Sequence, residues 1–177
     1  SLQEPPTLPL YDRVVEELTA FGLIFPDKDF KPGTVYRLFG HLKPEAIEVA
    51  CAVDPFAYVS HLSAMEYHAL TDRFSRILYL TTPTDKAMPY RLAKLPTLRR
   101  LSFERIEGQR IELMRRSNRG AFKTIKSTGI RVATVGRAFL DMVREPHHCG
   151  GIQHVVDVYR QYAQRNLSLI LDEIDRH

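Results

Sequence analysis

The chain has 177 residues, of which 44% are hydrophobic and 26% charged, a composition that suits a packed protein with a real core, and its formal net charge is +4. No apolar run approaches the roughly 18 residues that a membrane-spanning helix requires, and residues 1–9 lack the basic and apolar regions of a signal peptide. The two distant cysteines, Cys51 and Cys149, indicate neither a disulfide framework nor a zinc ribbon, so we expect a soluble, cytoplasmic protein.

The first predicted elements are a helix and a pair of strands within residues 1–40. Apolar side chains recur at helical spacing over residues 11–21, and Gly22 can end that helix in a left-handed conformation. Short apolar runs at 23–25 and 35–38 flank a polar turn with a Pro-Gly pair, a pattern typical of two paired strands. Helix, strand, loop and strand is the order of the second half of a winged helix-turn-helix.

A winged helix of this kind would present its helix to DNA and its basic loop beside it. A complete module also needs two upstream helices, which ten residues cannot hold, so the recognition part is either absent from this chain or degenerate. A helix and hairpin that serve as an ordinary lid are the alternative. The basic side chains expected on or beside the wing are Lys28, Lys31 and Arg37.

The rest of the chain alternates helical and strand patterns. Predicted helices cover residues 44–53, 58–70, 134–143, 152–163 and 167–174. Residues 76–82 are apolar on both faces, which indicates a central strand, and 131–133 form another short strand. A loop at 83–96 precedes a hairpin predicted between 98–106 and 110–115.

This order of helices and strands predicts an α+β fold, a small mixed β-sheet packed with helices. We expect it to form a domain over residues 41–177, preceded by the partial winged-helix-like segment at 1–40.

Positive charge is concentrated in one stretch of the chain. From Arg91 to Arg131 there are twelve Lys or Arg against three acids, a local net charge of +9 that leaves −5 on the remainder. Such a cluster gains free energy by releasing counterions from a polyanion, which favours nucleic acid as a partner. A solvated face, or a surface for an acidic protein, are the alternatives. The candidate DNA-binding side chains are Arg99, Arg100, Arg105, Arg110, Arg115, Arg116, Arg119, Lys123 and Lys126.

Candidate metal ligands and catalytic groups are sparse. His61 and His68 lie two helical turns apart, whereas helical zinc pairs lie four residues apart, and we interpret both as structural. The run His147-His148-Cys149 precedes a Gly-Gly turn and is interpreted as a loop before a helix rather than a zinc site. We therefore predict no metal and no cofactor.

Motifs for hydrolysis or nucleotide binding are missing from the sequence: it contains no Gly-x-Ser-x-Gly, P-loop or Gly-x-Gly-x-x-Gly. A metal-dependent nuclease would need carboxylates gathered near a lysine, for which Asp85-Lys86 and Glu104 are the loose candidates. Asp141 follows Arg137 by four residues, which favours an ion pair that anchors a helix. The protein is accordingly predicted not to be an enzyme.

Two segments carry a resemblance to a known family. Residues 57–70, AYVSHLSAMEYHAL, and residues 132–143, VATVGRAFLDMV, followed by Pro146 and a Gly-Gly pair, resemble in order and separation two segments of AbiEi-type antitoxins. The resemblance spans roughly residues 35–174. One departure is Gly136, where that family tends to carry an acid before the arginine.

The resemblance implies a non-catalytic transcriptional regulator and antitoxin of a type IV toxin–antitoxin, or phage-defence, operon. It implies an N-terminal winged helix that binds double-stranded DNA at the promoter of its own operon, and a C-terminal domain that counters a nucleotidyltransferase-like toxin. A homo-oligomer is left open, and no membrane partner is expected. The alternatives are an antitoxin that binds protein without binding DNA, and a metal-dependent nuclease.

Overall fold

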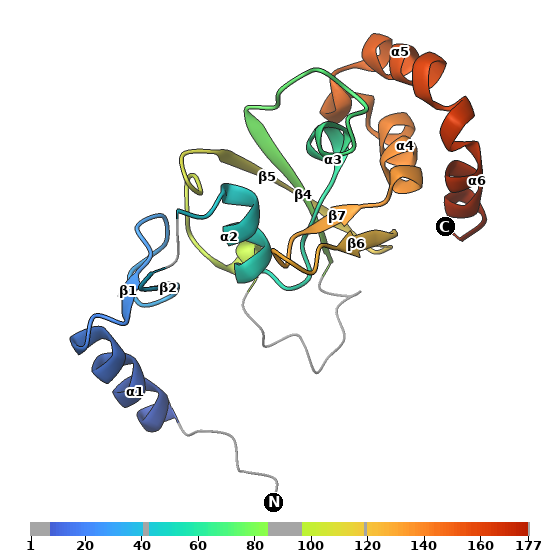
Figure 1. Cartoon of the computed structure of the whole chain (residues 1–177). Helices are drawn as coiled ribbons and strands as arrows, with labels where there is room; N and C mark the ends of the chain where they lie inside the picture. Colours follow the sequence, from blue (N-terminus) through green and yellow to red (C-terminus); the bar gives the residue numbers. More distant parts are fainter. Residues whose placement is uncertain (1–7, 41–42, 85–96, 119, 177) are drawn as a thin grey trace, which may run out of the picture.

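The computed structural model describes residues 8–40, 43–84, 97–118 and 120–176. Its N-terminal unit consists of helix α1 (Leu8–Ala20) and strands β1 (Ile24–Pro26) and β2 (Tyr36–Leu38), which pair antiparallel. Gly22 follows α1 with a φ of 66°, the left-handed conformation predicted for it. Figure 1 shows α1 standing apart from the rest of the molecule, which it meets through the hairpin.

A five-stranded mixed sheet forms the centre of the body, in the order β5-β4-β3-β7-β6. Its strands are β3 (Tyr58–Val59), β4 (Ile77–Pro83), β5 (Arg110–Arg116), β6 (Phe122–Thr124) and β7 (Arg131–Ala133). Strand β4 runs parallel to β5 and antiparallel to β3, and β7 runs parallel to β3 and antiparallel to β6. The central strand predicted at 76–82 is confirmed as β4, which has neighbours on both sides.

Helices pack around this sheet, so the fold is α+β as predicted. They are α2 (Ala46–Val53), α3 (His61–Tyr67), α4 (Val135–Arg144), α5 (Ile152–Tyr162) and α6 (Leu167–Arg176). Figure 1 shows α4, α5 and α6 together at the side of the sheet that lies away from the N-terminal unit. The core joins apolar residues of the sheet, including Leu80 and Val132, to Met65 of α3 and Phe139 of α4. No helix in the described residues is long and apolar enough to cross a membrane.

Two predictions about the middle of the chain are wrong. The hairpin expected between 98–106 and 110–115 is absent: Leu98–Arg100 form one turn of 3-10 helix, and a single bridge joins Ile106 to Gln109. Strand β5 pairs with β4 instead. The prediction failed because the alternating apolar residues of β5 suit either neighbour equally well. The helix expected over 58–70 is shorter, since its first residues form β3.

Candidate functional site

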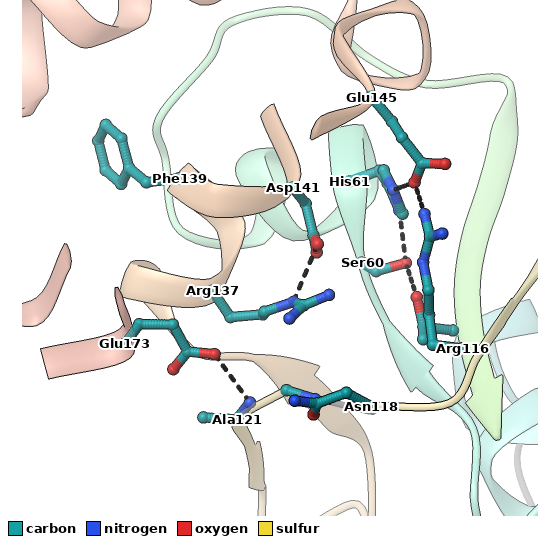
Figure 2. A network of polar contacts seen from close by, with 12 residues as sticks. Ser60, His61, Arg116, Asn118, Ala121, Arg137, Phe139, Asp141, Glu145 and Glu173 are labelled. Carbon is teal, nitrogen blue, oxygen red and sulfur yellow. Dashed lines mark hydrogen bonds and ion pairs between the residues drawn. The ribbon is translucent and has the colours of Figure 1, made fainter. Parts of the chain in front are cut away.

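The two sequence segments that carry the family resemblance meet beside the sheet. Ser60 and His61 come from the junction of β3 and α3, Arg137 and Asp141 lie on α4, and Glu145 follows α4. Figure 2 shows their side chains gathered with Arg116 from the end of β5. A local strand-to-helix turn and a single helix thus supply most of the site, and the sheet brings them together.

A chain of hydrogen bonds runs outward through His61. The Thr81 hydroxyl donates to Ser60 Oγ over 2.9 Å, and Ser60 Oγ lies 2.8 Å from His61 Nδ1. His61 Nε2 lies 2.8 Å from Oε2 of Glu145. A carboxylate can only accept, so Nε2 carries the proton and Nδ1 accepts from the Ser60 hydroxyl. The chain therefore has one direction, from Thr81 to Glu145.

The imidazole of His61 is neutral at physiological pH. Burial lowers the pKa of His61 to about 4, although the nearby Asp141 carboxyl acts in the opposite direction. His61 also has a φ of 50°, a conformation that a residue other than glycine adopts at some cost in strain. Surrounding contacts must therefore hold His61 in place, and its two ring hydrogen bonds are among them.

Ser60, His61 and Glu145 have the connectivity of a hydrolytic relay, in which a serine donates to a histidine oriented by a carboxylate. Ser60 is fully buried, however, and its hydroxyl also accepts from Thr81. A nucleophile must reach a substrate, and in this conformation Ser60 Oγ reaches none. What the arrangement does accomplish is to orient the Glu145 carboxylate, which is 21% exposed in its side chain.

Glu145 joins the relay to the sheet edge. Its Oε2 atom accepts from His61 and, on the outer side, from the guanidinium of Arg116 at the end of β5. Arg116 remains about one-third exposed, with 32% of its side chain accessible. One carboxylate thus neutralises a cation of the basic stretch and fixes the place where β5 ends.

A second ion pair lies deeper, between Arg137 and Asp141 one turn apart on α4. Their closest atoms, Nε and Oδ1, are 2.9 Å apart, and the two side chains are 1% and 2% exposed. Burial raises the pKa of Asp141. Arg137 Nε and Nη1 and Asp141 Oδ2 have no partner in hydrogen-bonding geometry within the described part of the chain. The predicted helix-anchoring pair is confirmed, in a fully buried setting that sequence spacing did not indicate.

The described residues from the end of β5 to the start of β6, 116–118 and 120–121, are here called the crossing segment, and these two strands form opposite edges of the sheet. Gly120 lies directly on Arg137: a Cβ atom at Gly120 would come within 2.5 Å of Arg137 Cδ, and Gly120 has a φ of 70°. Both facts require glycine at this position. The side chain of Arg137 therefore forms the support on which the crossing segment rests.

Helix α6 contacts the other end of the crossing segment. Glu173 is buried, and its carboxylate accepts from the backbone N–H of Ala121 over 3.1 Å and from the Thr134 hydroxyl over 3.5 Å. Thr134 caps α4 by accepting from the N–H of Arg137. Figure 2 shows Glu173 reaching the crossing segment from α6.

Gly136 explains how α6 comes so close. A Cβ atom at Gly136 would lie 2.1 Å from the carbonyl oxygen of Leu169, so any side chain at this position would clash with the α6 backbone. The buried acid beside the start of α4 is instead Glu173, from α6. The departure noted in the sequence thus coincides with a close helix–helix contact.

Two of the three predicted wing residues, Arg37 and Lys28, lie at the contact between the hairpin and the body. Arg37 Nε donates to buried Asp27 over 2.5 Å, and its Nη2 donates to Glu107. Hydrogen bonds to these acids raise the pKa of Arg37, although burial acts to lower it. Lys28 is exposed and lies 3.4 Å from Glu107, and Lys31 is exposed. Of the three, Arg37 is therefore committed to holding the hairpin.

The candidate DNA-binding residues of the basic stretch do not form one strand face. Arg110 and Arg115 belong to edge strand β5 and Lys123 to the opposite edge strand β6, whereas Arg99 and Arg100 lie in the 3-10 turn. The exposed members within the described residues are Arg100, Arg105, Arg110, Arg115, Lys123 and Lys126. Arg119 lies outside the described residues.

Several cations of the basic stretch already bind a partner within the protein. Arg116 is neutralised by Glu145, and Arg110 lies 3.5 Å from Glu112. Arg105 donates to the backbone oxygen of Gly108. Arg131, which closes the basic stretch, turns inward and donates to backbone carbonyls at the end of α2. These contacts engage several cations of the basic stretch within the protein, so fewer of them are available to an outside partner than the sequence suggested.

The remaining candidates have defined places. His68 Nε2 lies 2.6 Å from the carbonyl oxygen of Ala133, which supports its structural interpretation. His147 and His148 lie in a 3-10 helix, Pro146–Cys149, rather than a loop, and His148 packs against His61. No group of three metal-binding side chains lies close together in the part of the chain that the structure describes. Glu104 is exposed, and Asp85 and Lys86 lie outside the described residues.

Glu145, Glu173 and Gly120 were not predicted as site residues. Each acts across a long separation: Glu145 meets His61 over 84 residues and Arg116 over 29, and Glu173 meets Ala121 over 52. One feature of the sequence could have indicated Glu145: it directly precedes Pro146, where α4 ends, so its side chain lies outside the helix. No local pattern marks the other two.

Comparisons with known proteins give no further identification: no family model matches the chain, and no curated protein matches it.

Proposed function

We propose that this protein is a non-catalytic, DNA-associated regulator and antitoxin. The observation that carries the proposal is a group of exposed cations in the basic stretch that form no ion pair with an acid among the described residues. Arg115, Lys123 and Lys126 are exposed and form no ion pair with a described residue. Unpaired cations of this kind gain counterion-release free energy from phosphate, whereas an arginine held by a carboxylate gains less.

The N-terminal unit supports the same proposal in its arrangement. Helix, strand, loop and strand lie in the order of a winged helix, and α1 projects away from the body. Arg37 pairs with Asp27 within the hairpin and with Glu107 of the body, so it holds the hairpin on the body. Base reading would belong to this unit, and the exposed cations would contact the backbone without reading sequence.

The test is DNA binding across a salt series, with the upstream promoter fragment compared with a scrambled duplex of equal length. We expect binding that weakens steeply with salt. Replacing Arg115, Lys123 and Lys126 together by glutamine should reduce the slope of log K against log salt by about 0.9 for each lost phosphate contact. The matched control replaces Lys43, Arg144 and Arg160, exposed cations outside the basic stretch, by glutamine. Absence of binding by the unaltered protein at low salt would overturn the proposal.

A second candidate function, an antitoxin that binds protein and not DNA, is favoured by the surface of α1. This helix carries three acids and one base, and phosphate repels its net negative charge. Its apolar residues Leu10, Tyr11 and Val14 are 42–55% exposed, and Phe21 beyond its end is 78% exposed. Uncovered apolar stripes of this size are typical of protein contacts.

The two candidates differ in the role of α1. Replacing Tyr11 and Val14 by serine should leave DNA affinity and its salt slope unchanged if α1 serves a protein partner, and should abolish any preference for the promoter if α1 reads DNA. A melting curve of the variant serves as the control for folding.

A further inference from the structure

We propose that edge strand β5 is a docking surface for a second copy of this chain, here called the partner, and that the two β5 strands pair antiparallel about a twofold axis at Met114. The pairing joins the two central sheets edge to edge. It also places the partner's Glu112 opposite Arg116, a residue of the candidate site. The inference goes beyond the proposed function and does not depend on DNA binding.

The first step is the hydrogen-bonding capacity of the outer side of β5. The N–H of Thr84 donates to the carbonyl oxygen of Arg116, so the backbone groups of Arg116 point toward β4. Successive residues of a strand point these groups to opposite sides, so those of Ile111, Leu113 and Arg115 point away from β4. No described residue is hydrogen-bonded to these outward N–H and C=O groups. Strand β5 therefore offers a row of donors and acceptors to a further strand.

The second step is a contrast between the two edge strands. Strand β6 has three residues with Lys123 at its centre, and a short edge strand with a lysine is protected against pairing with another chain. Strand β5 has seven residues, contains neither lysine nor proline, and follows β4 without a bulge. Its charged side chains are therefore the feature that decides whether two copies of β5 attract or repel each other.

The third step is the register, since most registers bring like charges together. An axis at Leu113 would place Arg110 opposite the partner's Arg116. An axis at any charged residue of β5 would place that residue opposite its own copy, which applies to Arg110, Glu112, Arg115 and Arg116. Like charges directly opposite each other destabilise a strand pair. An axis between two residues would pair outward-pointing backbone groups with inward-pointing ones, which cannot bond.

Two positions for the axis remain, Ile111 and Met114. An axis at Ile111 would pair Leu113 with the partner's Gln109. In each copy, however, the N–H and C=O groups of Gln109 are already bonded to those of Ile106. This axis would therefore leave the outward groups of Leu113 without a partner, at a cost in free energy if they were buried.

An axis at Met114 satisfies both backbone and charge. It pairs Leu113 with the partner's Arg115, and the outward groups of these two residues exchange both of their hydrogen bonds. On the other face of the strand it places Glu112 opposite the partner's Arg116, and the twofold axis repeats each contact. Opposite charges in directly opposed positions stabilise a strand pair. The order of residues in β5 is therefore self-complementary in this register.

The partner's Glu112 adds a second acid to a residue of the candidate site. Arg116 donates to Glu145 through Nη2, and its side chain is 32% exposed. A guanidinium has five N–H donors, so Arg116 keeps donors for another carboxylate. Glu112 is also accessible: its side chain is 38% exposed, with Arg110 3.5 Å away. In the paired state Arg116 is shared between Glu145 and the partner's Glu112.

The first experiment measures the molar mass of the full chain by sedimentation at concentrations from about 1 µM to about 500 µM. A strand pair buries little surface, so we expect a reversible dimer that salt weakens. Glu112→Arg should raise the dissociation constant about tenfold or more, because two attractive pairs become repulsive. The matched control is Glu104→Arg, the same change at an exposed acid outside β5, which should leave the dissociation constant unchanged.

A second experiment locates the axis by disulfide crosslinking. In Met114→Cys the two new thiols lie opposite each other in a non-hydrogen-bonded pair, with Cβ atoms about 4.5 Å apart, which suits a disulfide. Mild oxidation should therefore give a covalent dimer. In Glu112→Cys, on the same strand and face, the new thiols lie too far from each other and should stay unlinked. Both native cysteines are buried, and a cooperative melt confirms that each variant folds.

The two experiments can each overturn the inference. A chain that stays monomeric at every concentration would do so, and so would a crosslink through Glu112→Cys in place of Met114→Cys. A dimer that Glu112→Arg leaves intact, but that replacing Tyr11 and Val14 by serine dissociates, would place the contact on α1 instead. The proposed function is tested by DNA binding, so its failure and the failure of this inference are distinguishable.

Discussion

Two arginines, Arg37 and Arg137, hold parts of this molecule in place at different depths. Arg37 joins the hairpin of the N-terminal unit to the body, with an 18% exposed side chain near Asp27, Asp29 and Glu107. Arg137 lies under the crossing segment, is 1% exposed and has Asp141 as its carboxylate partner. Arg37 is thus a partly exposed cation near three acids, whereas Arg137 is a buried cation paired with one acid among the described residues.

The difference shows that arginine–carboxylate pairs have two different structural roles in this molecule. At Arg37, several acids share one cation, so the loss of one of them still leaves the guanidinium with a partner. At Arg137, Asp141 is the one acid paired with the cation among the described residues, so breaking the pair exposes the full cost of a buried charge. The first contact is suited to joining two units, and the second to fixing a backbone path.

The largest expected effect comes from breaking the buried pair. Arg137→Met should lower the free energy of unfolding by about 3–5 kcal/mol, because Asp141 is left buried without its cation. The double variant Arg137→Met, Asp141→Leu should recover most of that loss, since no charge is then buried. Urea denaturation of the two single variants and the double variant measures this. A double variant as unstable as the sum of the singles would show that the two residues do not act as a pair.

The next effect concerns the close approach of α6 to α4. Gly136→Ala should lower the free energy of unfolding by up to about 3 kcal/mol, because the new methyl group meets the backbone carbonyl of Leu169 and α6 must move. Proteolysis within α6 should accelerate in parallel. Ser168→Ala, an exposed change on α6 itself, serves as the control and should alter neither measurement. An unchanged melting curve for Gly136→Ala would contradict the close packing.

Acid should destabilise the body through His61. Its folded-state pKa of about 4 lies below the ordinary value of 6.5. Between these two pH values, the imidazole is protonated in the unfolded chain and neutral in the folded one. Stability is therefore retained above pH 6.5 and lost as pH falls toward 4, by about 2 kcal/mol between pH 7.5 and pH 5. The raised pKa of Asp141 acts in the opposite direction, since the folded state takes up that proton first.

Denaturant titrations at both pH values, for the unaltered protein and for His61→Gln, isolate this contribution. The variant should lose most of the difference between the two pH values, even if it is less stable at each. If the pH dependence of the variant equals that of the unaltered protein, other histidines carry it. His148 and His154 are the alternatives, because burial also lowers the pKa of each.

Sequence patterns were informative here wherever a contact is local. The cap at Thr134, the extent of α4 and the pairing of Arg137 with Asp141 all lie within one helix, and periodicity indicates them. Strand β4 was predictable too, because a strand with neighbours on both sides is apolar on both faces.

Long-range contacts account for what sequence patterns left out. The neighbour of β5 could not be identified from Ile111 and Leu113, since their alternation suits a hairpin or a parallel strand. Strand β6 was missed because it is an edge strand of sequence Phe-Lys-Thr whose last two residues are exposed, so no apolar run marks it. The meeting of Glu145 with His61 and Arg116 depends on the completed sheet, which is why the most connected residue of the site was missed.

The smallest expected effect concerns the contact of the hairpin with the body. Glu107 accepts from Arg37 and lies near Lys28, and these contacts lower the pKa of Glu107 below its ordinary value. Glu107→Gln should change the free energy of unfolding of the body by about 1 kcal/mol or less, because Gln can still accept a hydrogen bond and Arg37 keeps Asp27 as a partner. It should instead loosen the N-terminal unit, seen as faster hydrogen exchange in residues 24–38.

The matched control is Glu104→Gln, three residues earlier, which removes an equal charge without touching Arg37 and should leave exchange in the hairpin unchanged. Because the pKa of Glu107 is lowered in the folded state, its contribution is present at neutral pH and is lost as pH falls through that pKa. In acid, the hairpin of the unaltered protein should therefore show protection factors, corrected for the pH dependence of intrinsic amide exchange, as low as those of Glu107→Gln at neutral pH. Equal exchange in β4 for all three proteins would show that the joint loosens while the body stays folded, whereas faster exchange in β4 as well would mean that Arg37, like Arg137, supports the core.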